Sequence, residues 1–155
     1  MRASASTRPL NAGDTATFRE LLSVFGDAFD DPATCNSRQP DDAYVERLLS
    51  SENFVAIAAF DGPKVIGGLA GYILPKFEEA RSEFYIYDLA VHEDYRRQGV
   101  ATALIDHLKT LVAGRGVYVI FVQAGYRDDA AVALYTKLGI RKDVIHFDIK
   151  PCSVG

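Results

Sequence analysis

The residues best suited to chemistry lie in one stretch of the chain, residues 82–102. Its basic turn, Arg96-Arg97-Gln98-Gly99, precedes a segment whose apolar residues recur three and four positions apart, which is typical of a helix. The first turn of a helix leaves backbone N–H groups unpaired, and the helix dipole adds partial positive charge there. A glycine at such a turn also lets a phosphate group approach the backbone. We therefore predict a pyrophosphate-binding turn formed by Arg96, Arg97, Gln98, Gly99, Val100, Ala101 and Thr102.

This turn does not carry the glycines of the P-loop or of the dinucleotide-binding fingerprint. The alternative explanation is an ordinary turn between a strand and a helix, with two solvated arginines. Six matching residues occur often by chance, so the choice between the two depends on the rest of the chain.

A single carboxylate, Asp88, interrupts the apolar and aromatic run over residues 84–91, which we expect to be a buried strand. Burying an unpaired charge costs several kcal/mol, so Asp88 needs either a partner or a function. We interpret it as the group that binds a substrate ammonium and accepts its proton. The alternative is a structural carboxylate that a backbone N–H or a lysine satisfies.

The elements that must position these residues alternate between strands and helices. We expect strands over residues 7–10, 54–60, 65–74, 84–91, 117–122 and 144–149. Helices are expected after Asp14, after Asp41 or Asp42, at Gly99 and after Asp129, with Gly139 ending the last one. The strand over 84–91, the helix over 99–113 and the strand over 117–122 should form one right-handed crossover between parallel neighbours. The order predicts a mixed α/β sheet.

Glycines occur at the turn and in the second strand of the first hairpin of this sheet. Asp61-Gly62 predicts its turn. Gly67, Gly68 and Gly71 weaken the strand that follows, and they predict a bulge or a close approach by another group.

Size and composition describe one globular domain over residues 1–155, with short tails at about 1–6 and 151–155. The 48% hydrophobic and 25% charged content is that of a globular protein, and the net charge of −4 argues against a nucleic-acid partner. No apolar run approaches the ~20 residues that cross a bilayer, and residues 1–8 lack a signal-peptide core. We expect a cytoplasmic protein with two free thiols, Cys35 and Cys152, and no metal site.

Two segments resemble signatures of a known superfamily. Residues 89–104, LAVHEDYRRQGVATAL, resemble the acetyl-CoA signature of the GCN5-related N-acetyltransferases (GNAT), and residues 131–140, AVALYTKLGI, resemble their second signature. Residues 72–91, 129–141 and 146–148 are more closely similar to the gentamicin-type aminoglycoside 3-N-acetyltransferases, and the likeness extends over residues 21–148. The resemblance implies the GNAT fold, a mixed central sheet splayed between its two parallel middle strands, with helices on both faces.

The resemblance also implies roles for individual residues. Acetyl-CoA would be the acetyl donor, with its pantetheine arm in the gap between the splayed strands, paired with Leu89, Ala90 and Val91. Tyr135 would protonate the leaving thiolate, and Asp88 would deprotonate the amine. Many relatives carry Asn seven residues before this tyrosine, to bind pantetheine, but this chain has Asp128 there. Either Asp128 contacts the substrate instead, or the contact with the cofactor is lost.

A polycationic aminosugar would favour an acidic surface. We therefore expect substrate contacts from Asp31, Glu78, Glu79, Glu83, Tyr87, Asp128 and Asp129. Any one of the acidic residues alone is more typical of a solvated surface charge.

These observations favour transfer of an acetyl group from acetyl-CoA to the 3-amino group of an aminoglycoside by direct attack of the deprotonated amine, which would confer antibiotic resistance. Alternatives are the same chemistry on a polyamine or a peptide amine, and an acyl-CoA-binding module without catalysis. That module should lack the base and the acid, whereas both Asp88 and Tyr135 are present. We expect a homodimer that needs no metal and has neither a nucleic-acid nor a membrane partner.

Overall fold

The computed structural model describes residues 5–29 and 39–152. Its contacts divide the chain into two units, Met1–Gln123 and Ala124–Gly155. Two residues discussed above, Asp31 and Cys35, lie outside the described residues.

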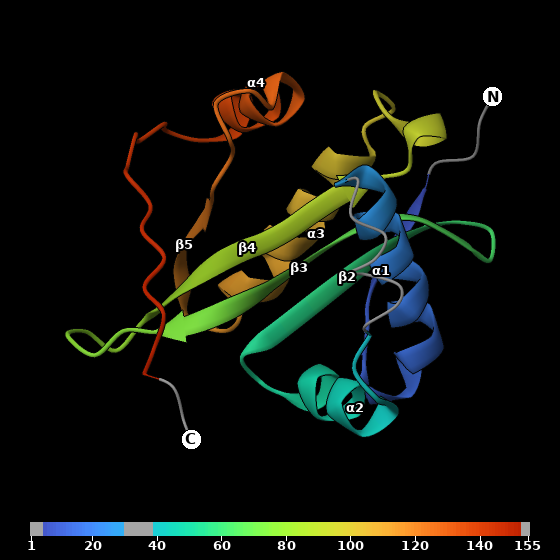
Figure 1. Ribbon diagram of the computed structural model, residues 1–155, viewed down its shortest axis with the longest axis horizontal. Helices are drawn as coiled ribbons and strands as arrows, with labels where there is room; N and C mark the ends of the chain where they lie inside the picture. Colours follow the sequence, from blue (N-terminus) through green and yellow to red (C-terminus); the bar gives the residue numbers. More distant parts are fainter. Residues whose placement is uncertain (1–4, 30–38, 153–155) are drawn as a thin grey trace. The chain divides into compact units, whose positions relative to one another are not determined.

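The first unit contains a five-stranded mixed sheet in the order β1-β2-β3-β4-β5 (Figure 1). Its strands are β1 (Ser6–Pro9), β2 (Phe54–Asp61), β3 (Lys64–Pro75), β4 (Ser82–Val91) and β5 (Val117–Val122). The first four strands pair antiparallel, and β4 pairs parallel to β5. The expected parallel neighbours are therefore confirmed.

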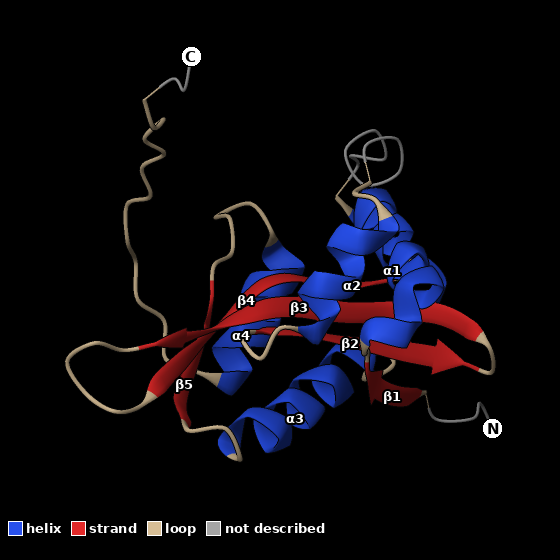
Figure 2. Ribbon diagram, turned by 90° about the horizontal axis from the view of Figure 1, so that it is seen from below, coloured by secondary structure: helices blue, strands red, loops and turns tan. Residues whose placement is uncertain are grey.

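Helices cover both faces of this sheet (Figure 2). On one face, α1 (Thr15–Ala28) and α2 (Asp42–Ser50) pack through residues such as Phe18, Leu21 and Val45 against Phe54 and its neighbours. On the other face, α3 (Val100–Ala113) packs through Leu104, Leu108 and Val112. Each face buries a separate apolar cluster, which fixes the sheet between two helical layers.

The caps of the first two helices differ from one another. The Asp41 carboxylate accepts from the Tyr44 N–H at 2.9 Å and caps α2, as expected. Asp14 occupies the N-cap position of α1, as expected, but its side chain makes no cap hydrogen bond there. The same carboxylate is held by Arg8 Nη1 at 2.9 Å and by the Asn11 N–H at 2.8 Å, in the 3-10 turn η1 (Ala12–Asp14).

The strand glycines allow close approach of the backbones. A Cβ on Gly71 would lie 2.1 Å from the Tyr85 carbonyl oxygen, and one on Gly68 would lie 2.7 Å from the Ile57 carbonyl oxygen. The pairing of β3 with β4 also shifts between Ala70 and Gly71. The predicted bulge and close approach are both confirmed.

The second unit contains one helix, α4 (Asp129–Leu138), among its described residues. The prediction that Asp129 caps this helix is wrong. The cap is Asp128, whose Oδ1 accepts from the Ala131 N–H at 3.1 Å. Asp129 lies in the first helical turn, where a carboxylate complements the helix dipole. The helix ends before Gly139, as expected, although Gly139 is extended with φ −150°.

The strand expected over residues 144–149 does not form, and that prediction is wrong for the described chain. A strand needs a neighbour for its N–H and C=O groups, and no described residue pairs with this segment. Side-chain pairs two positions apart, Arg141 with Asp143 and His146 with Asp148, lie along residues 140–152. Among residues 5–29 and 39–152, no helix is long and apolar enough to cross a membrane.

Candidate active site

The site begins where β4 loses its parallel partner. Pairing with β5 starts at Ser82–Val117 and ends at Ile86–Val122. Residues 87–91 of β4 therefore have no described strand on that side, and apart from the Val91 carbonyl, which accepts from Arg96, their backbone groups there have no described strand partner. Leu89, Ala90 and Val91, the residues expected to pair with pantetheine, belong to this stretch.

A bulge at Tyr87 determines which way Asp88 faces. Ala70 pairs with Asp88, but Gly71 pairs with Ile86, so Tyr87 is an extra residue on β4. Before the bulge, Phe84 and Ile86 belong to the cluster that packs on α3. After it, Ala90 belongs to the cluster under α1 and α2, and Asp88, two positions earlier, shares that face.

The Asp88 carboxylate is half-buried, and no described residue gives it a hydrogen bond or an ion pair. Desolvation by burial raises the pKa of this carboxyl above its usual range. The alternative explanation, a structural carboxylate held by a backbone N–H or a lysine, has no support among the described residues. An unpaired carboxylate of raised pKa at the free part of a strand is suited to binding an ammonium and accepting its proton.

Aromatic rings line the sheet beside Asp88. The rings of Tyr72 and Tyr87 lie 6.1 Å apart and edge to face, and Tyr85 contacts Tyr87 at 5.7 Å. Tyr85 also stacks on Phe121 at 4.8 Å, and its hydroxyl donates to Gln123 Oε1 at 2.9 Å. Burial, followed by the charges of neighbouring tyrosines and of Asp88, raises the pKa of Tyr72. Tyr72 was missed by the sequence analysis, although strand alternation places it on the face of Ala70.

The basic turn adopts an unusual backbone. Arg97 has φ 60° although it is not a glycine, and Gly99 has φ 82°. Non-glycine residues rarely adopt this left-handed region, and such strain is concentrated at functional sites. Gly99 is the N-cap of α3 and no side chain caps the helix, so the first-turn N–H groups of Val100, Ala101 and Thr102 remain free. Left-handed residues before an uncapped helix give a backbone geometry that suits an anion, and the pyrophosphate turn stays a prediction.

Side chains fix this turn to the sheet. The Tyr95 hydroxyl donates to Asp61 Oδ2 at 2.6 Å, in the hairpin turn between β2 and β3. Arg96 Nε donates to the Val91 carbonyl at 3.1 Å, and Gln98 Nε2 donates to the Asp94 carbonyl at 3.2 Å. Arg96 therefore connects the end of β4 with the turn, while Arg97 and Gly99 are exposed.

The acidic residues of the β3–β4 connection have basic partners. Glu78 pairs with Lys76 at 2.6 Å, and Glu79 pairs with Arg81. Glu83, on β4, lies 3.8 Å from Lys76 Nζ and accepts from the Tyr118 hydroxyl at 3.0 Å. Glu83 is five positions from Asp88, which corresponds to about 16 Å along a strand. The three glutamates are thus partly neutralised and lie toward the other end of β4 from the basic turn.

In the second unit, Tyr135 lies on α4 and is half-buried. Burial, and secondarily the Asp128 carboxylate, raises the pKa of its phenol, so the phenol stays protonated at neutral pH. Asp128 caps α4, a role that an asparagine side chain would fill equally well, so the cap alone does not explain the aspartate at this position.

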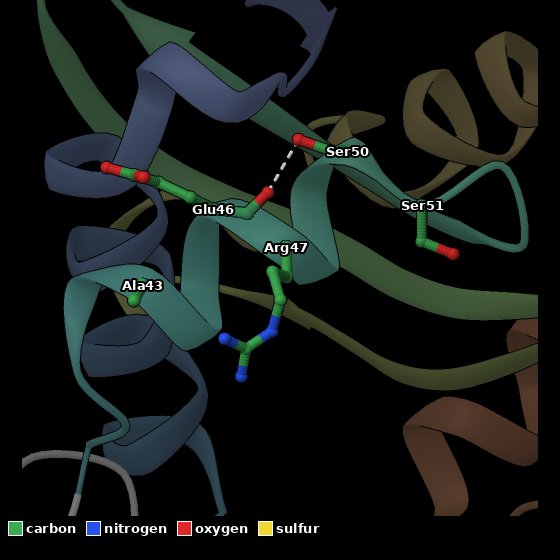
Figure 3. A pocket seen from close by; sticks show the side chains of 5 residues that line it. All are labelled: Ala43, Glu46, Arg47, Ser50 and Ser51. Atoms are coloured by element: carbon green, nitrogen blue, oxygen red, sulfur yellow. Dashed lines mark hydrogen bonds between the residues drawn. The ribbon is translucent and has the colours of Figure 1, made fainter.

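Described residues of the first unit line two of its hollows. One of about 260 Å³ lies where the end of α1 meets the end of β4 and the following turn, and Asp27, Val91, His92, Glu93 and Arg96 are among its lining residues. The other, of about 600 Å³, lies on α2 (Figure 3), and none of its lining residues belongs to β4 or to the basic turn. In the described part of the chain, no cluster of His, Cys, Asp and Glu could hold a metal ion.

Comparison with known proteins identifies similar chains. Residues 19–140 match the acetyltransferase (GNAT) family. The ribosomal protein bS18-alanine N-acetyltransferase of Escherichia coli K12 is 34% identical over 73 residues, which are 47% of this chain and 49% of that protein. The chain thus spans about half the length of the curated relatives that it matches first.

Two solved structures align over nearly the whole chain. The aminoglycoside acetyltransferase HMB0005, from an uncultured soil metagenomic sample, is 49% identical with TM-score 0.94, covering 97% of this chain and 100% of that one. The aminoglycoside acetyltransferase meta-AAC0020, also from an uncultured soil sample and in complex with sisomicin, is 29% identical with TM-score 0.88, covering 96% and 97%.

Proposed function

Since this chain belongs to the acetyltransferase (GNAT) family, we propose that it transfers an acetyl group from acetyl-CoA to the 3-amino group of an aminoglycoside. The observation that carries the proposal is the position of Asp88. This carboxylate has no partner among the described residues, and it lies on the stretch of β4 whose backbone edge is free. This short stretch of β4 would thereby bind the substrate ammonium beside the strand edge along which the extended acetyl donor can bind.

The donor would bind along β4 and at the turn before α3. Pantetheine carries two amide groups, which can pair with the backbone of Leu89 and the N–H of Val91 as an added strand would. Its pyrophosphate would meet the uncapped N–H groups of Val100, Ala101 and Thr102, with Arg97 adding charge.

The reaction would proceed by direct attack. Asp88 takes a proton from the substrate ammonium, and the amine nitrogen attacks the thioester carbonyl carbon. The developing oxyanion accepts a hydrogen bond from a backbone N–H of β4, which stabilises the charge. The carbon–sulfur bond then breaks, and the Tyr135 phenol protonates the CoA thiolate. The attacking nitrogen gives up its second proton, which returns to the Tyr135 phenolate through solvent, and Asp88 releases its proton to water. The products are the acetamide and free CoA.

An aminoglycoside acceptor has support from similarity and from charge. The two soil proteins that align over nearly the whole chain are named aminoglycoside acetyltransferases, and one is in complex with sisomicin. The net charge of −4 and the exposed Asp129 favour a cationic ligand. A peptide amine is the second candidate, because the bS18-alanine acetyltransferase is 34% identical over about half of this chain.

The deciding experiment measures thiol release from acetyl-CoA with three acceptors: gentamicin, spermidine and a peptide that begins with alanine. We expect turnover with gentamicin to exceed turnover with the other two by at least tenfold. NMR of the acetylated product should place the new amide on the 3-amino nitrogen. Turnover with the peptide alone would show that the substrate is a peptide amine and not an aminoglycoside. Acetylation at another nitrogen of gentamicin would contradict the proposed 3-amino position.

A further inference from the structure

We propose that Tyr72 and Tyr87 form an aromatic platform beside Asp88 that binds a saturated, cationic ring of the acceptor and favours cyclic aminosugars over linear amines. The inference rests on the proposed function and deepens it. It gives Tyr72, on β3, a direct part in substrate selection, and it specifies how Tyr87 contributes.

The two rings are exposed where the surrounding sheet is buried. Residues 65–71 of β3 are all buried, whereas Tyr72 is 38% exposed and Tyr87 is 63% exposed. Leaving large aromatic surface in water forgoes the stabilisation that its burial would bring. The rings fix each other, because their centroids lie 6.1 Å apart with an interplanar angle of 85°. They therefore present two preordered apolar surfaces at right angles.

The hydroxyl groups of the two tyrosines are also available. Neither hydroxyl has a hydrogen-bond partner among the described residues. By contrast, the hydroxyl of Tyr85 donates to Gln123, and that of Tyr118 donates to Glu83. The rings of the platform can thus pack against a ligand while their hydroxyls bond to its hydroxyl or amino groups.

The chemistry of this surface selects its ligand. The face of an aromatic ring is electronegative, so it attracts an ammonium group, and a neighbouring carboxylate adds to that attraction. Asp88 belongs to the same sheet face, and its charge influences the pKa of Tyr72. An aminosugar offers both an apolar ring face and several ammonium groups. A linear peptide amine offers one ammonium and no ring to pack on the platform.

The test replaces each ring with an aliphatic side chain. In Tyr72→Leu and Tyr87→Leu, we expect the KM for gentamicin to rise about 5–30-fold, while kcat changes less than about threefold. The KM for acetyl-CoA should not change. Tyr72→Phe keeps the ring, so its KM for gentamicin should stay within about threefold of wild type. In the leucine variants, any loss with spermidine, which offers ammonium groups but no ring to pack, should be smaller than the loss with gentamicin.

Tyr118→Leu is the matched control, because Tyr118 is a 45% exposed strand tyrosine that Arg81 covers at 3.7 Å. It should leave the KM for gentamicin unchanged. An unchanged KM in both leucine variants, with wild-type turnover on gentamicin, would overturn the platform and leave the proposed function standing. Equal losses in Tyr72→Phe and Tyr72→Leu would also overturn it. Wild-type protein without turnover on any aminoglycoside would instead remove the proposed function on which the platform rests.

Discussion

Asp88 lies opposite Ala70 in the ladder between β3 and β4, although the next pair along the ladder is Gly71 with Ile86. The extra residue, Tyr87, reverses the alternation of β4 and turns Asp88 away from the apolar layer under α3. A carboxylate on that layer would be desolvated without access to substrate. The bulge therefore places the Asp88 carboxylate on the face where a substrate amine could reach it.

Gly71→Ala should test how the bulge is held. A Cβ at this position would lie 2.1 Å from the Tyr85 carbonyl oxygen, so the strands must separate or the register must change. We expect a loss of about 1–3 kcal/mol in the free energy of unfolding, measured by urea denaturation, and a larger loss of turnover than of acetyl-CoA affinity. Gly125→Ala is the control, because nothing lies within 4 Å of its added Cβ. Wild-type stability in Gly71→Ala would contradict the close approach of the strands.

Asp88→Asn should lower kcat about 100–10,000-fold, because the amide cannot take the ammonium proton. Binding of acetyl-CoA, measured by calorimetry, should remain at the wild-type level. The control is Glu46→Gln, on an exposed carboxylate of α2. Wild-type turnover in the Asp88 variant would indicate that Asp88 has a structural role and is not the base.

The raised pKa of Asp88 also predicts a pH dependence of stability. A carboxyl whose pKa is higher in the folded than in the unfolded state contributes stability while it is protonated, below its unfolded pKa. That contribution is lost as the pH rises through the folded pKa. The wild type should therefore be less stable than Asp88→Asn at pH 7, and their melting temperatures should converge near pH 3. A wild type more stable than the variant at pH 7 would indicate a hidden partner for the carboxylate.

Gly99→Ala should separate backbone strain from ligand binding. Its φ of 82° is left-handed, so an alanine is destabilised by about 1–2 kcal/mol although the space for its Cβ is open. Gly116→Ala is a matched control, with φ 77° and equally open space. Both variants should lose similar thermal stability, but only Gly99→Ala should raise the KM for acetyl-CoA. An equal effect of the two on this KM would argue against the pyrophosphate turn.

Sequence patterns predicted the parts of this chain that local chemistry determines. The parallel crossover, the Asp41 cap and the bulge near Gly71 all follow from residue types at short range. The sequence pattern did not predict that Tyr87 is the extra residue, because a run of aromatic residues is compatible with a regular strand in either register. Tyr72 was missed for a related reason, since strand alternation gives the face on which it lies but not its exposure. The strand over residues 144–149 failed because strand formation requires a partner, which sequence alone does not supply.

Tyr135→Phe should slow acetyl transfer by about 100-fold without unfolding the protein. The phenol has a raised pKa and stays protonated at neutral pH, so it can give its proton to the thiolate, whereas phenylalanine cannot. Stopped-flow release of CoA at pH 7 would measure this step. Tyr126→Phe, on an exposed tyrosine that contacts Arg141, is the control. An unaltered rate in Tyr135→Phe would make this residue part of the packing of α4.

The C-terminal segment should be covered by a second copy of the chain in solution. Ile145, Phe147 and Ile149 recur at every second position, and they are 82%, 78% and 89% exposed. His146 and Asp148, paired at 2.8 Å, alternate with them. An extended segment with one bare apolar side and unpaired backbone groups tends to add to another strand. Light scattering should therefore give twice the 17.0 kDa chain mass. Phe147→Asp should reduce that mass to one chain, whereas Lys142→Ala should not. A monomeric wild type would contradict the expected homodimer.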